Sequence, residues 1–191
     1  NSVHLPLQAG ADRILRRMNR TYTQTQFLSL TKRVRNILPG CGISTDIIVG
    51  FPGETDEEFA ETLAVMEKIK FDSAFTFKYS SRPGTKAAEY NDHISEEVKE
   101  VRLAKLLDIQ HKHTIFRNRR EIGKTVNVLV EKESKKSSSE WAGRTDNNKW
   151  VIFPKGSADI CDFVDVTIID ARGVSLFGEI IQVGKISHAV V

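Results

Sequence analysis

The stretch from Ser44 to Thr55 constrains the fold of this chain more than any other segment. It runs from an apolar sequence, Ile47 to Val49, into a turn that contains two glycines, and a helix cap follows at Thr55. In parallel α/β proteins ligands bind at the carboxyl ends of strands, and glycine lets the backbone approach a ligand closely because it has no Cβ. The stretch therefore predicts either a ligand-binding loop or a tight strand-to-helix turn without a ligand.

Strand and helix patterns alternate three times along the first part of the chain. We expect strands near residues 3–7, 43–49 and 73–79, and helices near residues 11–18, 23–38, 55–69 and 96–119. This alternation predicts parallel strands joined by right-handed crossovers. Three such units cannot close a barrel, so one strand edge and an apolar inner face are expected to lie open. We therefore expect the chain to be a piece of a longer protein and to self-associate through the open edge.

Apolar spacing and cysteine usage indicate further side chains of the interior. Phe75, Phe77 and Tyr79 are expected in the core of the partial barrel rather than as a stacking platform. Cys41 and Cys161 stand alone, with no metal-ligand spacing around them. We expect both cysteines to be reduced and buried as small hydrophobic residues.

The pattern changes to short alternating strands near Gly123. Val126, Val128 and Val130 alternate with other residues, and residues 141–146, 150–153, 164–168 and 175–181 also have strand character. Five short strands in about 65 residues predict a small antiparallel barrel of the oligonucleotide-binding type. We place residues 1–118 in the partial β/α barrel and residues 119–191 in the small barrel.

Composition describes an ordinary globular protein. The chain is 40 % hydrophobic and 28 % charged. It contains no apolar run near the roughly 18 residues of a membrane span and no signal-peptide pattern, so we expect a cytoplasmic protein with no membrane partner. The formal net charge is +3, but residues 121–191 hold 9 Lys+Arg against 10 Asp+Glu. Any contact of that region with RNA must therefore be local.

Four ordered blocks resemble one enzyme family, the radical-SAM methylthiotransferases, and within it the branch that acts on tRNA adenosine. The blocks are HLPLQAG at residues 4–10, STDIIVGFPGET at 44–55, FTFKYSSRPGT at 75–85 and GRTDNN at 143–148. The resemblance covers nearly the whole chain. It implies an α/β fold, the C-terminal half of a radical-SAM β/α barrel, followed by a TRAM domain. The last block, with Phe153-Pro154 after it, looks like the tRNA branch rather than the ribosomal-protein branch.

The resemblance also implies an activity for the parent protein: methylthiolation of carbon 2 of isopentenyl-adenosine next to the tRNA anticodon. Such enzymes use S-adenosylmethionine, two 4Fe-4S clusters and a reductant protein. The CxxxCxxC triplet of the family is absent here, so we assign this chain no metal ligand and no catalytic residue, and expect it to be inactive alone. Two alternative activities of the parent are methylthiolation of threonylcarbamoyl-adenosine and methylthiolation of a ribosomal-protein aspartate. A third alternative, from another class, is that the chain is a non-catalytic RNA-binding module.

Two sets of binding residues follow from the resemblance. Contacts with S-adenosylmethionine are implied for Gln8, Gly10, Asp46, Gly50, Gly53, Ser80 and Arg82. Ala9 and Ala11 replace two serines that are usual in the family, so hydroxyl contacts from these positions are lost. RNA loops need positive charge for phosphates and flat rings for bases. The tRNA anticodon arm is accordingly expected on Lys132, Lys135, Lys136, Arg144, Asn147, Asn148, Lys149 and Trp150.

Overall fold

The computed structural model describes residues 1–184 and divides the chain into two compact units. The first unit comprises residues 3–113. The second comprises residues 1–2 together with the chain from Thr114 onwards. The division falls inside helix α4 (Glu96–Arg119), a few residues before the boundary that the sequence predicts. The last residues of the expected second domain, 185–191, lie outside the described residues.

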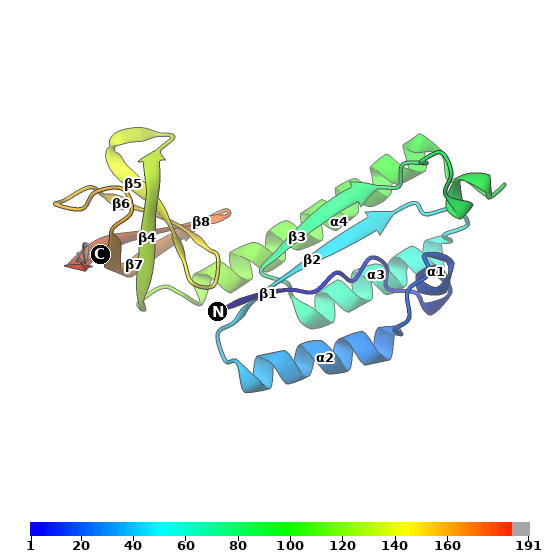
Figure 1. Cartoon of the computed structure of the whole chain (residues 1–191), viewed down its shortest axis with the longest axis horizontal. Coiled ribbons are helices and arrows are strands. Elements are labelled where there is room, and N and C mark those ends of the chain that lie inside the picture. The colour runs from blue at the N-terminus through cyan, green and yellow to red at the C-terminus, as the bar shows by residue number, and fades with distance from the viewer. Residues whose placement is uncertain (185–191) are drawn as a thin grey trace, which may run out of the picture. The chain divides into compact units, whose positions relative to one another are not determined.

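A three-stranded sheet in the order β1-β2-β3 forms the centre of the first unit (Figure 1). The strands are β1 (Ser2–His4), β2 (Gly42–Val49) and β3 (Ser73–Lys78). β2 and β3 are parallel, in register from Ser44 opposite Ser73 to Val49 opposite Lys78. A parallel bridge between Gln8 and Ile47 extends the pairing on the β1 side. The parallel α/β arrangement that the sequence predicts is therefore confirmed.

Helices follow the strands as the crossover pattern requires. They are α1 (Asp12–Arg17), α2 (Gln24–Ile37), α3 (Asp56–Ile69), the short 3-10 helix η1 (Lys86–Glu89) and α4. Two of these helices begin with a capping box: Thr23 exchanges hydrogen bonds with Gln26, and Thr55 exchanges them with Glu58. Each box satisfies two amide groups that a helix start leaves without an intrahelical partner. These caps fix where the chain turns from loop into helix.

The core of the first unit lies on one face of the sheet. Ile43, Ile47 and Val49 of β2 are fully buried there and pack with apolar residues of α2, α3 and α4. The opposite face carries the alternate residues of the strands. Phe75 and Phe77 lie on it with 58 % and 52 % of their surface exposed. The prediction that both rings belong to the core is wrong for the described residues, because the helices cover the other face only.

Five strands of the second unit close into a small barrel. They are β4 (Thr125–Ser134), β5 (Ser137–Thr145), β6 (Trp150–Pro154), β7 (Phe163–Arg172) and β8 (Ser175–Gly184), in the barrel order β4-β5-β6-β8-β7. All pairs are antiparallel except β6 with β8, which is parallel. Alternate residues of the strands fill the interior, among them Val128, Phe153 and Val166. The predicted five-stranded barrel is confirmed, with one parallel pair.

The two cysteines differ in their surroundings. Cys41 is buried, as the sequence predicts, but Cys161 is exposed and has a left-handed backbone with φ of 75°. The prediction that Cys161 is buried is therefore wrong; its residue occupies a turn before β7 rather than a strand. No helix in the described part of the chain combines the length and apolarity needed to cross a membrane.

Candidate nucleic-acid interface and cofactor site

The indole of Trp150 forms the centre of a basic surface on the small barrel. The register of β5 and β6 places Arg144 opposite Trp150, and the guanidinium carbon of Arg144 lies 4.3 Å from the centroid of the indole ring. The ammonium of Lys132 on β4 lies 4.5 Å from the same centroid. Both distances are within the range of cation–π attraction. We call Lys132, Arg144 and Trp150 the tryptophan strip.

Trp150 is half-buried, whereas Trp141 and Phe153 belong to the barrel core. Of the two aromatic side chains of β6, Phe153 is the one that faces the barrel interior. The ring of Trp150 remains partly accessible, with cationic groups beside it. Such a surface offers one ring for stacking and two positive charges for phosphates.

The turn between β5 and β6 is built by its own side chains. Asn148 has a left-handed backbone with φ of 65°, which asparagine tolerates well. Its side-chain oxygen accepts a hydrogen bond from Arg144, and the oxygen of Asn147 accepts one from the hydroxyl of Thr145. Glu131 lies 3.6 Å from the Arg144 guanidinium and offsets part of its charge. The asparagines thus hold Arg144 and the turn in place.

Lys149 lies apart from this surface. Its side chain is buried, and its ammonium donates a hydrogen bond of 3.0 Å to the side-chain oxygen of Asn118. Lys135 and Lys136 lie in the turn between β4 and β5, and both are exposed. The structure therefore gathers Lys132, Arg144 and Trp150 into one strip and directs the charge of Lys149 into the interior.

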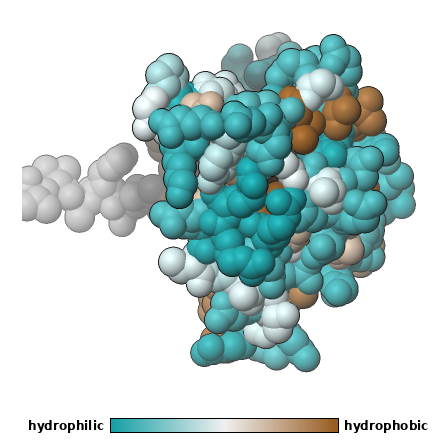
Figure 2. Space-filling model, turned by 90° about the vertical axis from the view of Figure 1, so that its right-hand side faces the viewer, coloured by the Kyte–Doolittle hydropathy of each residue, from teal (hydrophilic) through white to brown (hydrophobic). Residues whose placement is uncertain are grey.

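Three of the residues expected to contact S-adenosylmethionine follow the ends of neighbouring strands. Gln8 lies beside the end of β2, Gly50 follows β2 directly, and Ser80 comes two residues after β3. The arrowheads of β2 and β3 in Figure 1 point to this end of the unit, and Figure 2 looks onto it. Most of the surface visible in Figure 2 belongs to hydrophilic residues, with a small hydrophobic patch at the margin.

Gln8 is the residue of this group that fits a polar ligand best. It is 6 % exposed, and its backbone is held in the left-handed region at φ 63° by hydrogen bonds to Asp46 and Ile48. Its side-chain amide has no hydrogen-bond partner among residues 1–184. A side-chain amide without a partner in the protein has a donor and an acceptor available for a polar group supplied from outside the chain.

The three glycines of the set are explained by packing within the chain. A Cβ at Gly10 would overlap the backbone of Thr62, one at Gly50 would overlap the side chain of Lys99, and one at Gly53 would overlap the carboxylate of Asp92. Gly50 and Gly53 also have positive φ angles of 71° and 75°. Packing and backbone conformation within the chain therefore require these glycines, whether or not a ligand binds next to them.

The remaining two residues have different surroundings. Arg82 is exposed in the turn that ends at Thr85, and its guanidinium has no partner within the described chain. Asp46 lies in the middle of β2, with one carboxylate oxygen 3.3 Å from Nε2 of His4. The structure thus places Asp46 on the open face of the sheet rather than in the loops at its carboxyl end.

Sequence reasoning missed a buried ion pair that supports the glycine loop. Glu54 accepts a 2.8 Å hydrogen bond from the amide of Gly50 and another of 2.8 Å from Arg102 on α4. Burial raises the pKa of Glu54, while the Gly50 amide and Arg102 act in the opposite direction. Glu54 and Arg102 are 48 residues apart, so no local sequence pattern indicates the pair.

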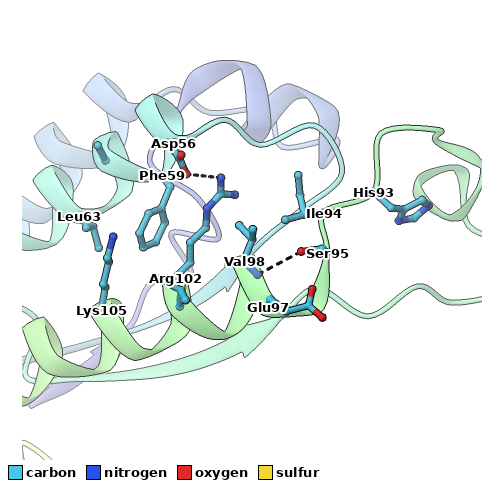
Figure 3. A pocket seen from close by; sticks show the side chains of 12 residues that line it. Asp56, Phe59, Leu63, His93, Ile94, Ser95, Glu97, Val98, Arg102 and Lys105 are labelled. Atoms are coloured by element: carbon cyan, nitrogen blue, oxygen red, sulfur yellow. Dashed lines mark hydrogen bonds and ion pairs between the residues drawn. The ribbon is translucent and has the colours of Figure 1, made fainter.

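Arg102 also lines a cavity of about 750 Å³ between α3 and α4 (Figure 3). Its guanidinium binds Asp56 at 2.8 Å, as the dashed line in Figure 3 marks, and Phe59 and Leu63 form an apolar wall. The arginine is therefore already paired with two carboxylates from α3 and its entry loop. Through Glu54, Arg102 links helix α4 to the loop that carries Gly50.

Comparison with known proteins places both units. Residues 1–66 match the radical SAM superfamily, and residues 119–181 match the TRAM domain. A tRNA-2-methylthio-N(6)-dimethylallyladenosine synthase of Christiangramia forsetii is 46 % identical over 180 residues, which are 94 % of this chain and 37 % of the relative. Synthases of the same name from Methylacidiphilum infernorum and Pelotomaculum thermopropionicum are 46 % and 45 % identical over 92 % of the chain.

The chain spans about 40 % of the length of these curated relatives. Over that span it resembles the radical-SAM methylthiotransferases of the tRNA adenosine branch, with part of a radical-SAM domain followed by a TRAM domain. The family resemblance found from the sequence blocks is therefore confirmed.

Proposed function

We propose that this chain supplies S-adenosylmethionine contacts and tRNA binding to a radical-SAM methylthiotransferase. The parent enzyme would add a methylthio group to carbon 2 of N6-dimethylallyladenosine beside the tRNA anticodon. The observation that carries the proposal is the 46 % identity over 94 % of the chain to a synthase named for this product, across both units. The tryptophan strip gives the proposal a physical basis on the RNA side, because it combines a ring with two cations.

S-adenosylmethionine, when bound, supplies a radical and a methyl group to this class of reaction. The proposed contacts of this chain are Gln8, Gly10, Asp46, Gly50, Gly53, Ser80 and Arg82, of which Gln8 brings a nearly buried amide without a partner. Glu54 and Arg102 would act through the backbone, because they hold the amide of Gly50 in place. The two 4Fe-4S clusters, and the reductant protein that serves them, would be bound by other parts of the parent, since Cys41 and Cys161 form no cluster motif.

The proposed RNA partner is the anticodon arm, bound in a cytoplasmic protein by the tryptophan strip with Lys135, Lys136, Asn147 and Asn148. Lys149 would act indirectly, because its ammonium is bonded to Asn118. The barrel region has no excess of positive charge, so few phosphates would be neutralised. About three phosphate contacts correspond to a slope of roughly −2 to −3 in log affinity against log salt.

The activity of the parent is tested by nucleoside analysis of tRNA from a strain that lacks its gene. Loss of 2-methylthio-N6-dimethylallyladenosine, with N6-dimethylallyladenosine retained, is the expected result. If the strain instead loses the methylthiolated threonylcarbamoyl nucleoside, the parent acts on threonylcarbamoyl-adenosine and the proposal is overturned. If its tRNA is unchanged and the ribosomal-protein aspartate lacks its methylthio group, the parent acts on that protein and the proposal is likewise overturned.

The RNA interface is tested by measuring anticodon-arm binding to the 191-residue chain at several salt concentrations. Arg144→Ala is expected to reduce the slope by about one unit, because one phosphate contact is lost. Trp150→Ala is expected to weaken binding by about 1–3 kcal/mol with an unchanged slope. Arg172→Ala is the matched control, since Arg172 also lies over an aromatic ring of the barrel, that of Phe177, at 4.9 Å. Equal effects of Arg144→Ala and Arg172→Ala would place the RNA surface elsewhere.

A further inference from the structure

The end of helix α4 carries positive charge that the proposed interface does not include. Residues 114–120 contain three arginines and no acidic side chain. Arg119 and Arg120 are exposed, and in the described part of the chain neither guanidinium has an ion-pair partner. The carboxylate that follows them, that of Glu121, is paired with the ammonium of Lys124 at 3.1 Å. The charges of both arginines are therefore available to an anionic partner.

An exposed aromatic ring lies beside these arginines. Phe116 is 44 % exposed, and the guanidinium carbons of Arg117 and Arg120 lie 5.9 Å and 5.8 Å from the centroid of its ring. Both distances are within the roughly 6 Å limit of cation–π attraction. A guanidinium that packs against a ring keeps its N–H groups at the edge of its plane, where they can donate to an anion. We call Phe116, Arg117, Arg119 and Arg120 the arginine patch.

Asn118 holds this end of the helix against the small barrel. It is 2 % exposed, its side-chain nitrogen donates a 3.3 Å hydrogen bond to the carbonyl of Gly173, and its oxygen accepts one of 3.0 Å from Lys149. Phe116 and Arg120 are each two positions from Asn118, which places them on the opposite side of the helix. Lys149 directly precedes β6, which carries part of the tryptophan strip. The arginine patch therefore lies near the tryptophan strip, with its ring on the solvent side of the helix.

The shape and charge of the arginine patch favour a phosphate backbone over bases. A convex helix end encloses no base, and arginine donors match the oxygens of phosphate in fork geometry. Double-stranded RNA is bound mainly through its phosphates and its shape, whereas unpaired bases need rings on which to stack. An RNA hairpin has paired strands in its stem and unpaired bases in its loop. The arginine patch and the tryptophan strip therefore fit two parts of one hairpin.

We propose that Arg119 and Arg120 bind the phosphate backbone of the double-stranded stem of the RNA whose loop contacts the tryptophan strip. Phe116 positions the guanidinium of Arg120 for this contact. The inference rests on the proposed function and adds to it a second contact surface, which recognises the stem by its backbone and reads no sequence. Together with Arg144, the two arginines account for the roughly three phosphate contacts proposed for this chain.

The test measures binding of the 191-residue chain to three RNAs: the anticodon arm, its loop as a single-stranded oligonucleotide, and its stem as a duplex without the loop. In the double variant Arg119→Ala, Arg120→Ala, the slope of log affinity against log salt for the arm should fall by about 1.6, since each lost contact removes about 0.8. At about 0.1 M salt this change corresponds to roughly fortyfold weaker binding of the arm. Binding of the duplex should weaken by the same factor, and binding of the loop oligonucleotide should not change.

Two further positions serve as controls. Lys124→Ala removes an exposed cation close to the arginine patch, but its ammonium is paired with Glu121, so binding of the arm should not change. Phe116→Ala should weaken binding of the arm about threefold with the slope retained, because the charges remain but Arg120 loses its ring. Phe116→Tyr keeps the ring and should bind as the native chain does. Thermal melting of each variant shows that it remains folded.

The proposal is overturned if the double variant binds the arm as the native chain does, or if it loses affinity equally for the arm and the loop oligonucleotide. An equally large effect of Lys124→Ala also overturns it, because the loss would then follow net charge rather than these two arginines. Failure of the proposed function has a different signature. The strain that lacks the gene would then retain 2-methylthio-N6-dimethylallyladenosine, whatever the RNA binding of this chain.

Discussion

Gly10 occupies a position where packing against α3 leaves no room for a side chain. Its amide donates a 2.8 Å hydrogen bond to the hydroxyl of Thr62, and a Cβ in its place would overlap the backbone of α3 at Thr62. Backbone cannot move aside as the end of a flexible side chain can. The loop after β1 therefore lies against α3 only because residue 10 has no side chain.

Gly10→Ala is expected to lower the free energy of unfolding by at least 1–3 kcal/mol, the usual cost of overpacking a core. Gly40→Ala is the matched control, because Gly40 has a positive φ of 84° but open space around its Cβ position. Gly40→Ala should lower the free energy of unfolding through backbone strain alone, by about 1 kcal/mol. Urea denaturation monitored by circular dichroism measures both values, and equal losses would contradict the packing explanation.

Glu54 is expected to make stability depend on pH in a direction unusual for a carboxylate. Burial raises its folded-state pKa above the ordinary value, so the folded state favours the protonated form. This contribution to stability is fully present below the unfolded pKa, near 4.5, and is lost as pH rises through the folded pKa.

The free energy of unfolding of the native chain minus that of Glu54→Gln should therefore grow as pH falls from about 7 toward the unfolded pKa. Glutamine keeps an oxygen that can accept the Gly50 amide and cannot titrate. Glu57→Gln, in the exposed first turn of α3 three residues further along, is the control. Denaturation curves at several pH values give the difference, and a difference that stays constant with pH, or that shrinks, would show that burial does not dominate at Glu54.

Among the elements, β3 has the least protection. It pairs with β2 on one side, and its other edge has no strand partner in the described part of the chain. Unpaired edges expose backbone donors and acceptors that can pair with a second chain, and exposed Phe77 adds an apolar contact. We expect self-association through this edge.

Phe77→Lys is expected to reduce that association, since natural proteins protect edges with charges placed on the strand. Phe163→Lys is the control, because β7 is paired on both sides, with β4 and with β8. Light scattering over a dilution series measures the mean mass. A native chain that remains monomeric at high concentration would contradict the expectation, as would equal loss of association in both variants.

The elements themselves were largely predictable from local sequence, whereas their partners were not. Alternating valines and capping residues act over a few positions, and β4, α2 and α3 appear where such patterns indicate. Phe75 and Phe77 follow the same alternation, but their burial depends on what covers that face, which local sequence does not state. The burial of Lys149 likewise depends on Asn118, 31 residues away. A lysine next to the Asn147-Asn148 turn gives the same sequence pattern whether its ammonium contacts RNA or, like that of Lys149, the side chain of Asn118.

At the scale of the whole molecule, each unit has a hydrophobic core of its own. Phe71 is a fully buried member of the first core, and Phe153 is buried in the core of the barrel. Each core is formed within one of the two compact units. We therefore expect the two units to lose stability separately when their cores are damaged.

Phe71→Ala is expected to reduce amide protection by about 3–5 kcal/mol in residues 3–113 and to leave the barrel unaffected, and Phe153→Ala is expected to do the reverse. Each variant is the control for the other, since both remove one buried phenylalanine ring. Native-state hydrogen exchange followed by NMR resolves the two regions. Loss of protection in both units from either substitution would show that they unfold as one.

The two units differ in their fluorescent side chains. The two tryptophans of the chain, Trp141 and Trp150, both lie in the barrel, and its three tyrosines, Tyr22, Tyr79 and Tyr90, all lie in the other unit. Selective excitation of indole fluorescence therefore observes the barrel alone. Trp141 is buried with its N–H bonded to the carbonyl of Ala158, so emission that changes when RNA is added would come from Trp150. The chain thus carries its own label for the surface proposed to meet RNA.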